Sequence, residues 1–145
     1  MGEDKTRTFL TKGSSMLPTI LPGSRLHVAP ARPDDLRPGD VACYIGQGSA
    51  VVAHRVVSTV GGEGNGTLVV KGDSQPTPET LPKSAVMYRV LRVENRFISY
   101  DTDGMMGRAL ARMALSDGIA VKGLQCALRT GISLAVFVKG FLRRR

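Results

Sequence analysis

The chain has 145 residues, 42% of them hydrophobic, and a formal net charge of +8. This length suits one globular domain and is too short for two ordinary ones. Residues 1–103 hold 12 basic and 11 acidic side chains, whereas residues 104–145 hold 8 and 1, so the excess charge belongs to the C-terminal segment. Nucleic acid is therefore the least favoured partner, since the basic segment carries no recognised reading motif.

The N-terminal residues 1–6 are polar, and we expect them to be disordered. They lack the apolar core of a secretory signal, and no uncharged run reaches the roughly 20 residues of a transmembrane helix. These features predict a cytoplasmic protein. The two cysteines, Cys43 and Cys126, are far apart and indicate neither a disulfide framework nor a metal site. No cofactor is predicted.

Short segments rich in Val, Ile and Tyr alternate with Gly and Pro turns through residues 7–103. This pattern is typical of a compact antiparallel β domain, and the fold class that we predict is mainly β. The expected strands are residues 7–11, 25–29, 41–45, 51–60, 67–71 and 86–93, with a further edge strand at 96–101.

The pattern changes after Asp103, where Ala, Leu, Met and Arg recur at helical spacing. We expect two helices, about 104–115 and about 119–142, which make residues 104–145 a basic, amphipathic helical appendage. Two interpretations of residues 119–145 stay open. The apolar face contacts the surface of a membrane with anionic headgroups, or it packs on the β domain or on another copy of the chain.

One stretch presents a serine on a backbone with little freedom. Gly13-Ser14-Ser15-Met16-Leu17-Pro18-Thr19 follows the first expected strand, and its proline stiffens the exit. A serine hydroxyl is a weak nucleophile unless a base in contact with it accepts its proton. The chain offers two histidines, His27 and His54. Taken alone, each is more simply explained as a half-buried strand histidine with a structural hydrogen bond.

His54 becomes the stronger candidate because Gly72-Asp73 follows it at the end of another expected strand. A carboxylate in that position could hold one imidazole nitrogen and fix the tautomer of the ring. Ser15, His54 and Asp73 are therefore the candidate catalytic residues.

Four blocks occur in order between about residues 11 and 79. They are Ser15-Met16-x-Pro18-Thr19, Pro38-Gly39-Asp40-Val41, His54-Arg55-Val56-Val57 and Lys71-Gly72-Asp73. In order and rough spacing they resemble type I signal peptidases of the archaeal and endoplasmic-reticulum type, members of a superfamily that includes the LexA-like repressors. Those enzymes use a Ser/His pair, where the usual bacterial signal peptidases use Ser/Lys. The resemblance implies a compact β domain of signal peptidase type with serine endopeptidase activity.

The resemblance implies a role for each matched residue. Ser15 would be the nucleophile and His54 the general base, while Asp73 would support the histidine or the site around it. Ser14, Ser15 and Met16 would form the oxyanion- and substrate-binding segment, with the Ser15 N–H aimed at the scissile carbonyl. A peptide or protein substrate would bind extended, as an added strand beside the segment that leads into Ser15.

Two departures from the family pattern bear on activity. Gly13 stands where family members often carry a serine whose hydroxyl also serves the oxyanion, and loss of such a donor typically costs about a hundredfold in rate. The family's further acidic residue has Glu79 as its nearest equivalent, and the role of Glu79 is left open. A second function therefore stays open, that of a catalytically weak or inactive peptidase-fold domain that binds a peptide or a partner protein.

Overall fold

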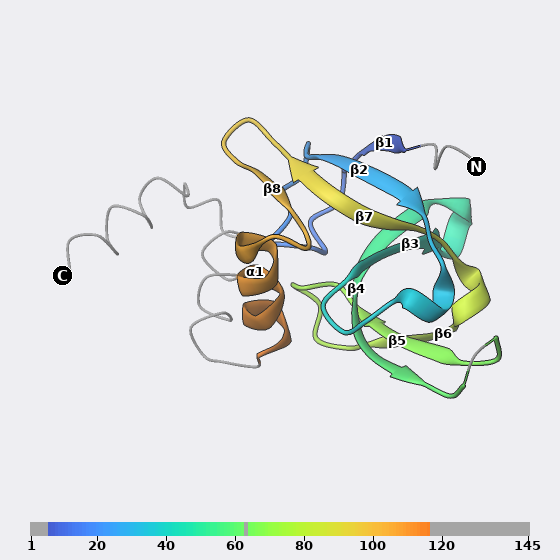
Figure 1. Cartoon of the computed structure of the whole chain (residues 1–145). Helices are drawn as coiled ribbons and strands as arrows, with labels where there is room; N and C mark the ends of the chain where they lie inside the picture. The colour runs from blue at the N-terminus through green and yellow to red at the C-terminus, as the bar shows by residue number, and fades with distance from the viewer. Residues whose placement is uncertain (1–5, 63, 117–145) are drawn as a thin grey trace.

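The computed structural model describes residues 6–62 and 64–116. Within these residues, eight strands form one curled antiparallel sheet, followed by one α-helix (Figure 1). The sheet order is β1-β2-β7-β3-β4-β5-β6, and β8 pairs with β7. This architecture confirms the prediction of a mainly β fold with a C-terminal helix.

The strands keep close to the alternating segments of the sequence. They are β1 (Arg7–Leu10), β2 (Arg25–Pro30), β3 (Val41–Ile45), β4 (Val51–Val60), β5 (Thr67–Lys71), β6 (Glu79–Pro82), β7 (Val86–Glu94) and β8 (Ser99–Asp101). Strand β8 is shorter than expected because the Asn95 side chain accepts hydrogen bonds from the N–H groups of Phe97 and Ile98 and closes a turn before the strand.

Strand β6 was not predicted. Its region is rich in proline, with Pro76 and Pro78 before the strand and Pro82 at its last position. Proline is tolerated there because β6 ends the sheet order and bonds only to β5. This edge strand begins at Glu79 and so brings that carboxylate into the sheet.

Two apolar clusters cover the two faces of the central strands. Alternation along β3 places Val41 and Cys43 in one cluster and Ala42 and Tyr44 in the other. The first cluster, core 1, contains Met16, Ile20, Leu26, Val28, Val41, Cys43, Val90, Val93 and Tyr100. The second, core 2, contains Leu36, Ala42, Tyr44, Val56, Leu68, Val70, Leu81 and Val86.

Helix α1 (Met105–Leu115) packs beside β8 (Figure 1). A Cβ on Gly107 would lie 2.3 Å from the Thr102 carbonyl oxygen, so glycine is needed where the helix approaches that segment. Leu110 packs against core 1. None of the described helices combines the length and apolar character needed to cross a membrane. The second expected helix, Cys126 and residues 1–5 lie outside the described residues.

Candidate functional site

The segment 11–20, called the serine loop, is anchored by buried side chains. Met16, Leu17, Thr19 and Ile20 are each at most 7% exposed, whereas Ser15 is half-buried. Met16 and Ile20 belong to core 1. The apolar side chains of the motif therefore hold the loop against the sheet and leave the candidate nucleophile at the surface.

The turn after β5 holds the same loop through its carbonyl groups. The N–H of Ser74 donates to the Ser15 carbonyl oxygen at 2.9 Å, and its hydroxyl donates to the carbonyls of Ser14 and Ser15 at 2.9 and 3.0 Å. A Cβ on Gly72 would lie 2.7 Å from the Ser15 oxygen, so glycine is required at this approach. The Ser15 carbonyl is thereby fixed, while its hydroxyl stays outside these bonds.

Asp73 and Arg55 form a buried ion pair next to this turn. Two guanidinium nitrogens of Arg55 donate to the two carboxylate oxygens, each at 2.8 Å, and the side chains are 5% and 2% exposed. Thr19 of the serine loop donates its hydroxyl to Asp73 and accepts a hydrogen bond from Arg55 at 3.0 Å. These contacts tie Asp73 to β4 and to the serine loop, and its charge also acts on His54.

His54 lies in β4 and is 3% exposed. The Tyr44 hydroxyl lies 2.9 Å from its Nδ1 and donates to Oε2 of Glu79, also at 2.9 Å. A tyrosine hydroxyl has one proton, so with that proton on Glu79 it acts toward Nδ1 as an acceptor. The neutral imidazole therefore carries its proton on Nδ1 and keeps the lone pair of Nε2 available.

Burial lowers the pKa of His54 below its usual value, while the charges of Glu79 and Asp73 act in the opposite direction. Because the net direction is downward, the ring is neutral at pH 7. A neutral imidazole with an available Nε2 has the form that a general base requires.

Ser15 and His54 come from neighbouring parts of the sheet. Arg55, the residue after His54, pairs with Lys71 at the end of β5. The turn that follows Lys71 binds Ser15, so this turn lies at the level of His54 along β4. His54 faces core 2, since it alternates with Arg55 and shares its side of β4 with Val56. Within the described residues, no hydrogen bond joins Ser15 Oγ to His54. Ala53 lines the groove that begins at Ser15, so His54, the next residue, leaves β4 on the opposite face.

The serine loop offers backbone donors beside the hydroxyl. Among the described residues, neither the Ser15 N–H nor the Met16 N–H donates a hydrogen bond, whereas the next N–H, of Leu17, donates to the Ser14 carbonyl at 3.2 Å. Unused N–H groups next to a nucleophile can stabilise an oxyanion. At Gly13, a Cβ would meet nothing within 4 Å, so the missing hydroxyl of the family pattern leaves open space.

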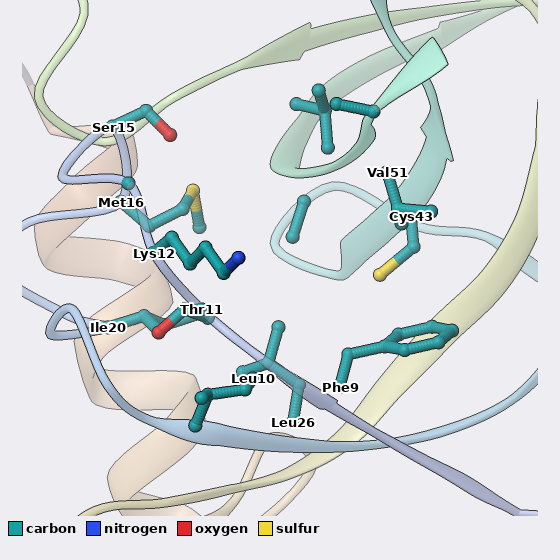
Figure 2. Close-up of a pocket in the computed structure, with 14 residues that line it drawn as sticks. Phe9, Leu10, Thr11, Lys12, Ser15, Met16, Ile20, Leu26, Cys43 and Val51 are labelled. Carbon is teal, nitrogen blue, oxygen red and sulfur yellow. The ribbon is translucent and has the colours of Figure 1, made fainter.

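An apolar groove of about 420 Å³ begins at Ser15 (Figure 2). Its walls are residues 9–13 and residues 50–53, and its floor includes Met16, Leu26 and Cys43. This volume falls within the usual range of ligand pockets. Burial raises the pKa of the Cys43 thiol to about 12, so this residue forms part of the floor as a neutral group and is not a competing nucleophile.

Two strand edges border the groove. β1 ends the sheet order, and β5 pairs with β4 only from Arg55 onward, so among the described strands neither β1 nor residues 51–53 have a neighbour on the groove side. Leu10 and Val51 are 62% and 47% exposed on the two walls. Unpaired edges beside apolar side chains are the arrangement that binds an extended peptide as an added strand.

No protein-family model, curated protein or solved structure matches this chain. The resemblance to signal peptidases rests on the four sequence blocks. Among the described residues, no group of three His, Cys, Asp or Glu side chains is placed to hold a metal ion.

Three site residues were not singled out from the sequence, namely Tyr44, Arg55 and Thr19. Arg55 and Thr19 lie inside the matched blocks, where a charged side chain and a hydroxyl next to the candidate catalytic residues indicate polar contacts with them. Tyr44 lies two residues from Ala42, the cross-strand partner of His54. Period-two alternation would place it on the same face, but only once the pairing of the two strands is known.

Proposed function

We propose that the protein is a serine endopeptidase of the signal peptidase type that cleaves an extended peptide, with Ser15 as nucleophile and His54 as general base. The observation that carries the proposal is the position of Ser15 at the end of the apolar groove, with unused backbone N–H groups beside its hydroxyl. A peptide paired with the edges of β1 and β4 would be led toward Ser15 by main-chain hydrogen bonds.

In the first step, Ser15 Oγ attacks the scissile carbonyl carbon and its proton passes to Nε2 of His54. The N–H groups of Ser15 and Met16 stabilise the oxyanion. The C–N bond then breaks as His54 returns the proton to the leaving amine, and an ester remains on Ser15. Water attacks this ester with His54 again accepting and returning a proton, which releases the new carboxylate and restores the hydroxyl. The reaction requires the His54 side chain, which leaves β4 on the face opposite to the groove, to reach Ser15 Oγ around the unpaired edge of that strand when substrate is bound.

Two observations favour a second function, a peptidase-fold domain that binds a peptide without cutting it. Ser15 Oγ forms no hydrogen bond with His54 among the described residues, and Gly13 supplies no side-chain donor for an oxyanion. Such a domain would use the same groove. It would bind extended peptides, and no cleavage product would form.

The test is labelling with a serine-directed inhibitor of signal-peptidase type. The variants are Ser15→Ala and His54→Gln, and Ser84→Ala is the matched control because it removes an exposed hydroxyl outside the groove lining. An endopeptidase gives label on the wild type and on Ser84→Ala, and loses it in the other two variants. Thermal unfolding shows that each variant is folded. Label that persists in Ser15→Ala contradicts the proposal.

A further inference from the structure

We infer that the groove selects peptides with a carboxylate side chain near the cleavage site and that Lys12 recognises this carboxylate. The inference rests on the proposed function of the groove as a peptide site. Lys12 lies on the wall of the groove, three residues before Ser15. Figure 2 shows its side chain extending past Met16 into the space between the two walls.

Lys12 is the one charged residue on the described lining of this groove. It is exposed and forms no ion pair or hydrogen bond with any described residue. The two buried Lys and Arg side chains among the described residues have acidic partners: Lys83 binds Asp34 at 3.1 Å, and Arg55 binds Asp73. An ammonium beside an apolar wall, with no carboxylate of a described residue paired to it, attracts a carboxylate of the bound peptide.

Strand geometry indicates which peptide side chains meet Lys12. Successive side chains of an added strand point to opposite sides. One set faces the floor formed by Met16, Leu26 and Cys43, which favours small or apolar side chains. The other set points away from this floor, and the exposed Lys12 side chain, which projects from the wall into the space between the walls, lies beside it. The favoured peptide therefore carries an acidic residue directly next to an apolar one.

The test compares peptides, blocked at both ends, that differ only by Glu or Gln at one scanned position near the cut. With the wild type we expect kcat/KM to be about fivefold higher for the best Glu peptide, the scale of an exposed ion pair. The preference disappears in Lys12→Met, and in Lys12→Glu it turns toward a peptide with Lys at that position. Arg7→Met is the matched control, because it removes a β1 cation that lies over the Tyr88 ring and outside the groove lining.

The same peptides are also titrated against Ser15→Ala by fluorescence anisotropy, which reports binding without cleavage. Equal kcat/KM and equal affinity for Glu and Gln peptides overturn the inference and leave the peptidase proposal standing. A Glu preference that survives Lys12→Met also overturns it. If the Glu peptide binds more tightly than the Gln peptide only when Lys12 is present, and the wild type cleaves neither, the inference about Lys12 is supported and the peptidase proposal is excluded.

A further arm repeats the comparison with peptides that have a free C-terminus. If Lys12 increases affinity for peptides with a free C-terminal carboxylate and not for those with a Glu side chain, the assignment of Lys12 to a side-chain carboxylate is wrong. Absence of any binding removes both the proposed function and this inference.

Discussion

The substitution Tyr44→Phe removes one oxygen from the link between His54 and Glu79. In the wild type that hydroxyl lies 2.9 Å from Nδ1 of His54 and 2.9 Å from Oε2 of Glu79. Without this hydroxyl, water can hydrate Glu79, which is exposed. Water cannot replace it at Nδ1 of His54, because that residue is only 3% exposed. A buried donor without an acceptor costs about 2 kcal/mol, and we expect the free energy of unfolding to fall by about that amount.

The same substitution should also change the chemistry of the ring. With no acceptor at Nδ1, the imidazole is free to carry its proton on Nε2, the nitrogen that has to accept the proton of Ser15. If the peptidase proposal holds, we expect kcat/KM to fall about tenfold in Tyr44→Phe. This is the effect of losing one hydrogen bond worth about 1.4 kcal/mol.

The measurement is the ¹⁵N spectrum of protein labelled in histidine, which distinguishes the two tautomers, with His27→Gln used to assign the signals. We expect Nδ1–H in wild-type His54 and a mixture in Tyr44→Phe. Tyr88→Phe is the matched control, because its hydroxyl forms no hydrogen bond within the described residues and its ring packs edge-on against Phe9. A wild-type ring protonated on Nε2, or an unchanged spectrum in Tyr44→Phe, would refute the tautomer argument.

Three further predictions concern single side chains. Because the pKa of His54 is lowered by burial and raised by Glu79, kcat/KM should fall with acid only below pH 6.5, and Glu79→Gln should move that fall to still lower pH. Gly13→Ser places a hydroxyl in open space beside Ser15, so kcat/KM should rise by about tenfold or more, with the free energy of unfolding changed by less than about 0.5 kcal/mol. Asp73→Asn leaves the buried Arg55 without its counter-charge, and urea unfolding should show a loss of about 3 kcal/mol.

Each of these has an outcome that contradicts it. A pH profile that moves to higher pH in Glu79→Gln would mean that Glu79 does not act on His54 through its charge. An unchanged or lower rate in Gly13→Ser would exclude an oxyanion role for that position. For Asp73→Asn, the comparison is Asp101→Asn in the exposed pair with Arg92, where we expect less than about 0.5 kcal/mol. Equal losses in the two variants would show that burial does not set the strength of the Arg55 pair.

The fold could largely be predicted because its strands alternate in hydrophobicity. The expected segments 41–45, 51–60 and 67–71 coincide with β3, β4 and β5, where one face and then the other enters an apolar core. Strand β6 could not be predicted in this way. It lies at the edge of the sheet, and only Leu81 of its residues enters core 2. An edge strand held by main-chain bonds leaves little periodic signal in its side chains.

Some residues of the candidate site are likewise indicated by local sequence patterns, whereas others are brought together only by the strand pairing. Ser15, His54 and Asp73 could be singled out as candidates because each lies in a short local pattern next to glycine, proline or a strand end. The link from His54 through Tyr44 to Glu79 could not, since it joins three strands whose residues are up to 35 positions apart in the chain. No local pattern encodes such a contact, because it depends on which strands become neighbours.

The sequence by itself determined the mainly β class, the strand positions at the centre of the sheet and the serine on a stiff loop, because these follow from local alternation and backbone restriction. Only the tertiary structure decided what surrounds that serine. Strand order left the edges of β1 and β4 open beside it, and pairing gave Asp73 to Arg55 and Tyr44 to His54. These contacts arise when distant strands bury their apolar faces together, and that global condition is not contained in any one segment.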